Sequence, residues 1–135
     1  MPPSDIEQGR KATAGKELAI TAEALYLSNL LILPGVGFVA LLILYLRKKR
    51  DTSPLAACHL RQTLSASIWA GILLLVLNTV IIFFGGYQAP STWVIVIIYF
   101  TVVHASFVIL GTLGLAAALA GKHYHYPVVG ASCSQ

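Results

Sequence analysis

Most of this chain carries no charged residue, and that absence constrains the fold more than any other feature. Between Arg61 and Lys122 the sequence runs for 60 residues without Lys, Arg, Asp or Glu, and residues 24–46 give another 23. A helix that crosses the hydrocarbon core of a bilayer needs about 20 apolar residues. The long run therefore predicts two crossings joined by a turn, and the short run predicts a third.

The fold class that follows is an all-α integral membrane protein, a single domain of 135 residues. We expect transmembrane helices at residues 24–46, 64–84 and 92–120, after a polar segment at 1–23 and before a tail at 121–135. Two short helices complete this plan: an interfacial one at 17–23 and an amphipathic one before the second span. Ser53 is the predicted N-cap of the latter and Pro54 its first residue.

The first span contains Pro34, Gly35 and Gly37. Proline has no backbone N–H and pushes away the carbonyl four residues earlier. The predicted result is a kink that leaves the carbonyl of Leu30 without its helical partner. The alternative is a re-entrant segment hinged at Pro34, because each half is too short to cross a membrane.

Orientation follows from the basic residues, since loops rich in Lys and Arg stay on the cytoplasmic side. Five of them form the predicted cytoplasmic anchor, which can also contact anionic lipid headgroups: Arg47, Lys48, Lys49, Arg50 and Arg61. The C-terminal tail is then cytoplasmic and the 85–91 turn lies outside. The N-terminus lies outside if the first span crosses, and inside if it is re-entrant. The clustering of these charges argues against a nucleic-acid partner.

Two motifs resemble a known family. Cys58-His-Leu-Arg-Gln62 opens the second span, and Gly121-Lys-His-Tyr-His-Tyr-Pro127 follows the third. These segments resemble a family of small bacterial three-helix membrane proteins of unknown function, which is distantly similar to the small multispanning subunit of the chloroplast inner-envelope translocon. The resemblance implies the bacterial inner membrane, with a periplasmic side opposite the cytoplasmic one, and implies no activity.

His104 is the one histidine within a predicted span, and an ionisable residue there is a functional candidate. At 1.5 Å per residue it lies at the depth of Pro34. We expect a neutral His104 to donate a hydrogen bond to the carbonyl that Pro34 frees; the alternative is a haem or other cofactor ligand. Small and polar residues that let membrane helices approach closely form a predicted packing seam: Gly71, Asn78, Gly111, Gly114 and Ala118.

The predicted topology brings Cys58, His59, His123 and His125 to one surface, and thiolate and imidazole suit zinc or copper. Their spacing matches no metal motif, so we expect His59 and Arg61 instead to cap the helix ends or bridge them to Tyr124, Tyr126 and the backbone before Pro127. On the cytoplasmic side Cys58 and Cys133 are expected to be reduced and unpaired.

Enzymatic activity is not expected, because the predicted spans contain no Asp or Glu and none of the familiar hydrolase motifs. The sequence favours a non-catalytic accessory or assembly subunit of a larger inner-membrane complex of respiratory, photosynthetic or translocation type. Its partners are other membrane subunits, and no cofactor is required. The alternative is a haem- or metal-binding membrane protein that uses His104 or the Cys58, His59, His123 and His125 group.

Overall fold

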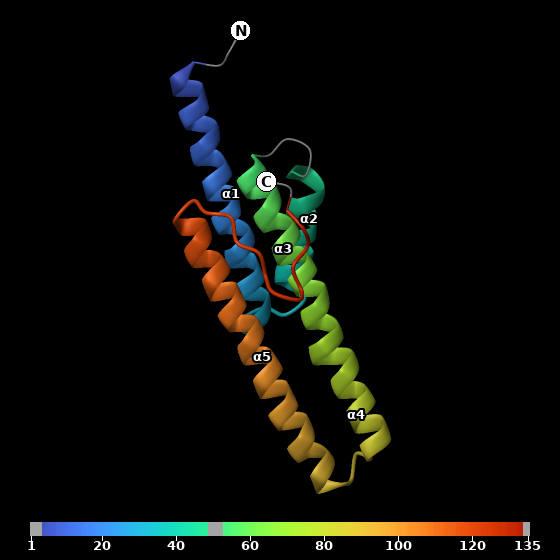
Figure 1. Ribbon diagram of the computed structural model, residues 1–135. Helices are drawn as coiled ribbons and strands as arrows, with labels where there is room; N and C mark the ends of the chain where they lie inside the picture. The colour runs from blue at the N-terminus through green and yellow to red at the C-terminus, as the bar shows by residue number, and fades with distance from the viewer. Residues whose placement is uncertain (1–3, 49–52, 134–135) are drawn as a thin grey trace.

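The computed structural model describes residues 4–48 and 53–133, and these residues form helices and connections without a strand (Figure 1). Lys49, Arg50 and their neighbours at 51 and 52 lie outside the described residues. The helices are, in order, α1 (Asp5–Leu31), α2 (Val36–Lys48), α3 (Pro54–Gly71), η1 (Ile72–Val76), α4 (Leu77–Gly85) and α5 (Pro90–Leu119).

Two long helices dominate the molecule. α3, η1 and α4 form one continuous helix from Pro54 to Gly85, in which η1 is a single turn of wider π-helix, and α5 runs beside it. Both are long and apolar enough to cross a membrane. The predicted second span, 64–84, lies within the first of them, and the predicted third span, 92–120, ends one residue beyond α5. The expected short helix is the first part of α3, where Pro54 is at the start and Ser53 accepts a hydrogen bond from the Ala56 amide.

The turn between α4 and α5 is closed by uncharged groups. Gly86 has a positive φ of 85°, a conformation that costs glycine little. The Thr92 hydroxyl donates to the Gly85 carbonyl at 2.7 Å, and the Trp93 indole donates to the Tyr87 carbonyl at 2.8 Å. These bonds satisfy backbone groups at the end of the hairpin farthest from both termini.

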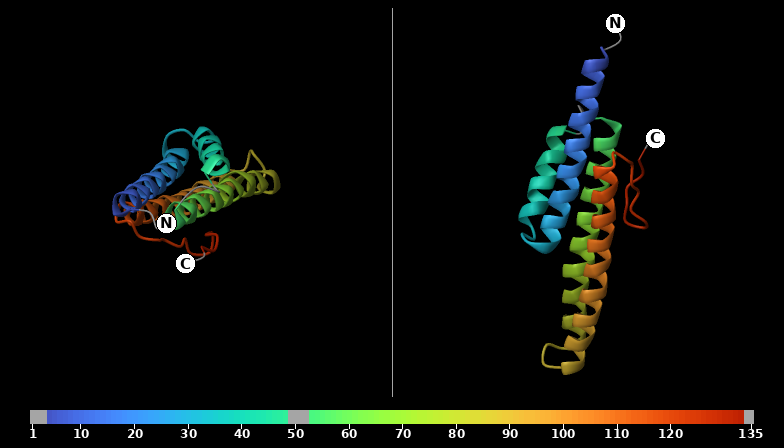
Figure 2. Two further views of the ribbon diagram at one scale, coloured as in Figure 1. Left: turned by 90° about the horizontal axis from the view of Figure 1, so that it is seen from above. Right: turned by 90° about the vertical axis from the view of Figure 1, so that its left-hand side faces the viewer.

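The prediction that residues 24–46 cross the membrane as one helix is wrong. The chain reverses at Pro34, and α2 returns antiparallel along α1 (Figure 2). Pro34 ends α1, Gly35 takes a φ of 88°, and the Asn29 side-chain oxygen accepts from the amides of Gly35 at 2.8 Å and Phe38 at 3.0 Å. The structure thus has the hairpin of the re-entrant alternative, and among the described residues two helices, instead of three, are long and apolar enough to span a membrane.

The N-terminal segment also differs from expectation. In place of a flexible stretch and a short helix at 17–23, α1 is helical from Asp5 onward. Gly15 is tolerated within this helix because packing there outweighs helix propensity. Gly15 lies so close to Ser53 that a Cβ atom would meet the serine side chain, and Ala19 and Ala22 are fully buried. α1 is therefore a central helix, packed against α2, α3 and α5.

The core sits where these four helices meet. One cluster is built around Tyr26, Phe107 and Tyr126, and a second around Ala22, Leu41 and Leu60. Toward the α4–α5 turn the other helices end, and the two long helices continue alone. Phe83 and Phe84 near this turn are 80 % and 82 % exposed. Such bare apolar side chains are what a lipid environment covers.

Candidate functional site

A fully buried pair of polar side chains joins α1 to α3. Glu23 and His59 are both fully buried, and His59 Nδ1 lies 2.6 Å from Glu23 Oε1. The other ring nitrogen, Nε2, donates to the Lys122 carbonyl at 2.9 Å, since a carbonyl only accepts. Glu23 and Nδ1 must therefore share one proton, as a carboxylate with an imidazolium or as an acid with a neutral ring.

Tyr126 completes this group from the C-terminal tail. Its hydroxyl donates to Glu23 Oε2, and its ring packs edge-on against Tyr26 at 5.8 Å. Burial, and then the nearby Glu23 charge, raise the pKa of the Tyr126 phenol. The same causes raise the pKa of Tyr124. The phenol of Tyr126 therefore remains a donor to Glu23 throughout the physiological pH range.

The depth of this group follows from helix geometry. His59 precedes Gly85 by 26 residues, which is about 39 Å at 1.5 Å per residue. The hydrocarbon core is only about 30 Å thick. If the α4–α5 turn lies at one surface of the membrane, Glu23, His59 and Tyr126 lie at the headgroup level of the opposite surface.

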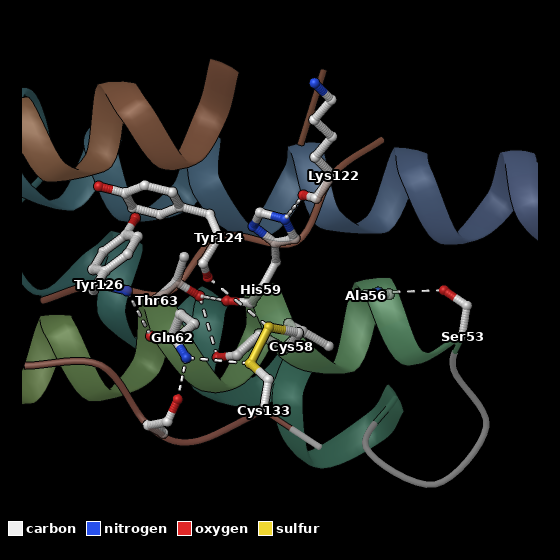
Figure 3. Close-up of a disulfide and its surroundings, with 12 residues drawn as sticks. Ser53, Ala56, Cys58, His59, Gln62, Thr63, Lys122, Tyr124, Tyr126 and Cys133 are labelled. Carbon is white, nitrogen blue, oxygen red and sulfur yellow. Dashed lines mark hydrogen bonds between the residues drawn. A yellow bond between two sulfur atoms is a disulfide. The ribbon is translucent and has the colours of Figure 1, made fainter. Parts of the chain in front are cut away.

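The C-terminal tail runs back along α3 and is held there at several points (Figure 3). Gln62 accepts from the Tyr126 amide at 3.2 Å and donates to the Ala131 carbonyl, and Ser65 donates to the Val129 carbonyl at 2.7 Å. The predicted bridge to the backbone before Pro127 is confirmed for His59 by its bond to the Lys122 carbonyl, whereas Arg61 is exposed.

The expectation that Cys58 and Cys133 are reduced and unpaired is wrong. They form a disulfide that links the start of α3 to the end of the tail, 75 residues apart in sequence. The physical reason is the path of the tail: its hydrogen bonds to α3 carry Cys133 back to Cys58. No sequence pattern indicates that path, because the described part of the tail has no regular secondary structure.

The four predicted metal ligands do not converge. Cys58 is in the disulfide, both nitrogens of His59 are engaged, and His123 and His125 are exposed. Over the described part of the chain, no three His, Cys, Asp or Glu residues gather closely enough to hold a metal ion. The anchor residues Arg47, Lys48 and Arg61 are exposed, while Lys49 and Arg50 fall outside the described residues.

His104 lies where the sequence places it. Its Nε2 donates to the Leu30 carbonyl at 3.0 Å, which confirms the predicted bond to the group that Pro34 frees. The His104 ring also stacks on Phe100, with centroids 5.4 Å apart and planes at 9°. This bond ties α5 to the tip of the α1–α2 hairpin.

The predicted seam residues occupy different surroundings. Gly111 and Gly114 lie where α1 comes closest to α5, since a Cβ atom would meet Tyr26 at one and Glu23 at the other. Ala118 is fully buried. Asn78 donates to the Leu74 carbonyl at 2.6 Å within its own helix. Gly71, in contrast, faces open space.

Three residues important to the site escaped the sequence interpretation. From the sequence, Glu23 is only the last residue of the polar segment 1–23, Tyr126 is only an expected contact of His59, and Asn29 has no assigned role. One pattern could have indicated that Glu23 is buried. It lies three residues before Tyr26, on the face of α1 that also carries Ala19 and Ala22. Its partners come from distant segments, so the pairing itself had no local signal.

Comparison with known proteins identifies the family. The model of the magnetosome magnetite crystal formation protein family (MamF/MmsF) matches residues 15–132. The chain belongs to this family. The match covers nearly all of the described structure, from the middle of α1 through the docked tail. No curated protein and no solved structure matches the chain.

Membership of the magnetosome magnetite crystal formation family bears on two expectations. It agrees with a small bacterial membrane-protein family, as the resemblance implied, and with the two helices that are long and apolar enough to cross a membrane. It gives no support to the likeness to the chloroplast translocon subunit, nor to the two short motifs on which that resemblance rested.

Proposed function

We propose that this chain is a non-catalytic accessory subunit of an assembly in the membrane that surrounds a forming magnetite crystal. The family description supplies the setting. It replaces the respiratory, photosynthetic and translocation complexes among the hypotheses. The observation that carries the accessory role is that the buried side chains of Glu23, His59 and Gln62 are occupied in holding the chain's own elements together.

Each potentially reactive group supports this reading. Glu23, His59 and Tyr126 bind one another across α1, α3 and the tail. His104 binds the hairpin tip, and Gln62 binds the tail. Groups with these partners are not presented to a substrate, whereas an enzyme needs a nucleophile or acid–base residue within reach of one.

The distribution of charge restricts how the chain can influence a mineral. Residues 62–121 carry no charge, so the α4–α5 turn offers no carboxylate to cations. Asp5 and Glu17 are exposed, but both lie in the part of α1 toward the terminal end of the molecule. The proposal therefore assigns the chain a role in the membrane itself, with partners that contact α4 and α5 along their exposed sides.

The proposed topology is that both termini and the Arg47–Arg61 connection lie on the cytoplasmic side of a bacterial membrane. The described basic residues at 47, 48, 61 and 122 all occur at the end of the molecule that holds the termini. Anionic lipid headgroups are the expected contacts of these residues.

Mild-detergent extraction from native membranes tests the accessory role. A tagged chain should elute in a particle much larger than the monomer in its micelle, with other membrane proteins in fixed ratio. The same sample in a denaturing detergent provides the monomer control. In a host that forms magnetite, deletion should change crystal size or number. A gently extracted monomer that restores the deletion phenotype would overturn the proposal.

A further inference from the structure

A pocket of about 360 Å³ lies where α2, α3 and the docked tail meet. α3 supplies Arg61, Ser65 and Ile68 to its lining, α2 supplies Tyr45, and the tail supplies Ser132. Arg61 is exposed, and it is the one charged residue in the described lining. No carboxylate of the described residues forms an ion pair with it. The pocket therefore offers an accessible cation to an anionic ligand.

The tail segment that forms one wall of this pocket is held at two points (Figure 3). The Gln62 side chain donates to the carbonyl of Ala131, the residue before Ser132. The disulfide to α3 holds Cys133, the residue after it. Ser132 is thus fixed from both sides, and the wall is part of the docked fold although the tail has no regular secondary structure.

The two ends of the pocket lie at different depths in the membrane. Arg61 precedes Gly85 by 24 residues, or about 36 Å along the helix, and Ile68 precedes it by 17, or about 26 Å. With the α4–α5 turn at one membrane surface, a hydrocarbon core about 30 Å thick ends between these two positions. Arg61 then lies at the headgroup level, and Ile68 lies among the acyl chains.

One face of α3 leads from this pocket into a larger apolar cavity. Arg61, Ser65 and Ile68 follow one another at spacings of four and three residues, so they lie on the same side of the helix. Ile68 also lines a cavity of about 580 Å³ under the tip of the α1–α2 hairpin, together with Phe38 and Ile72. The two spaces adjoin at Ile68 and are together called the groove. The groove is polar at the headgroup level and apolar below it.

We propose that this groove binds one anionic phospholipid, with its phosphate at Arg61 and one acyl chain running past Ile68 into the cavity. A guanidinium binds phosphate through two parallel hydrogen bonds, and the hydroxyls of Tyr45 and Ser132 can donate to the remaining oxygens. The proposal depends on the α4–α5 hairpin crossing the membrane and not on the accessory role, so a gently extracted monomer would leave it intact.

The surrounding charges favour a headgroup with a net negative charge. Arg47 and Lys48 are exposed in the last turn of α2, shortly after Tyr45 along the chain. Basic residues near the membrane surface attract anionic lipids, whereas the ammonium group of a zwitterionic lipid gains nothing from them. A soluble phosphate shares the contact with Arg61 but leaves the apolar part of the groove empty.

Photolabelling tests the proposal with a phosphatidylglycerol that carries a diazirine near the end of one acyl chain. Purified protein reconstituted in phosphatidylcholine vesicles is labelled and digested, and the peptides are mapped. Label should concentrate on residues 34–38 and 68–75. Unlabelled phosphatidylglycerol should compete better than additional phosphatidylcholine, and the ratio of the two is the measured advantage of the anionic lipid. Soluble glycerol phosphate should not compete.

Two variants separate this groove from general lipid contact. Arg61→Gln should reduce the advantage of the anionic lipid about fivefold, as expected for one basic residue near the membrane surface. Arg47→Gln removes the same charge outside the pocket lining and is the matched control, which should keep the wild-type ratio. Gly71→Leu fills the cavity, where a Cβ atom meets no neighbouring group within 4 Å, and should move label away from residues 34–38. Circular dichroism melting verifies that each variant is folded.

Three results would overturn the proposal. The first is an equal advantage of the anionic lipid in folded Arg61→Gln and Arg47→Gln, which indicates no specific headgroup site. The second is label spread evenly along the exposed sides of α4 and α5 in the wild type, which indicates ordinary boundary lipid. The third is competition by glycerol phosphate as strong as that by phosphatidylglycerol, which indicates a site for a soluble anion.

Discussion

At the scale of single residues, the shared proton between Glu23 and His59 has the clearest consequence. Neither side chain is exposed, so removing one partner leaves the other buried without compensation. The carboxyl group of Glu23 also accepts a hydrogen bond from Tyr126. Its two oxygens therefore link α1, α3 and the tail.

Glu23→Leu should lower the free energy of unfolding by about 3 to 5 kcal/mol, the cost of breaking a buried charged pair. The double variant with His59→Leu should cost less than the sum of the two single variants, because neither group is then left alone. Denaturant titration in detergent measures both. Simple additivity would show that the pair is not coupled.

Tyr126 makes the stability of the fold decrease at alkaline pH. Its folded pKa is raised above the unfolded value of about 10, so the folded state holds this proton more tightly than the unfolded state. The stabilisation is complete below pH 10 and is lost as pH rises through the folded pKa. Tyr126→Phe should flatten the decline in thermal stability between about pH 9.5 and 11. A decline identical to that of the wild type would contradict this role.

At the scale of elements, the hairpin of α1 and α2 shows both what the sequence could predict and what it could not. Pro34 marked the break and His104 marked the partner of Leu30, because both effects are local or depend only on depth. The reversal depends on Asn29, whose side chain closes the turn. The burial of Glu23 and the path of the tail depend on contacts between distant segments, which no local pattern encodes.

His104→Leu should lower the free energy of unfolding by about 0.5 to 2 kcal/mol, the range for polar contacts between membrane helices. The loss should be concentrated at the hairpin tip, with faster amide exchange at residues 29–38 and little change in α4. His104→Gln should be milder, because an amide can still donate. Ser106→Ala, on the exposed side of α5, is the control. Equal exchange in His104→Leu and wild type would refute the link.

The docked tail is a second element with a testable anchor. Cys133→Ser removes the cross-link between α3 and the tail, whereas Gln62 and Ser65 still hold its backbone. Limited proteolysis should then cut residues 127–133 faster than in the oxidised wild type. Wild type treated with reductant should behave as the variant does. If the variant and the reduced wild type both resist proteolysis as the oxidised wild type does, hydrogen bonds alone secure the tail.

At the scale of the whole molecule, the hairpin leaves both termini toward the same end of the molecule, and the proposed topology places that end on one side of the membrane. Single cysteines at Ser4, His123 and Gln88, introduced into a Cys58→Ser/Cys133→Ser background, test this arrangement with a membrane-impermeant thiol reagent. In sealed cells only Gln88→Cys should react, and lysed cells verify that the other two can. Reaction of Ser4→Cys in sealed cells would instead support a first helix that crosses the membrane.

Because α1 and α2 stop at Pro34, the molecule is not equally wide along its length. Four helices and the tail occupy the terminal end, whereas only α4 and α5 continue to the opposite end. A protein of this outline takes up more area in one leaflet than in the other. Many copies, oriented alike, would favour a membrane that curves away from their broad ends. In a closed vesicle the broad ends would lie in the outer leaflet, where more area is available.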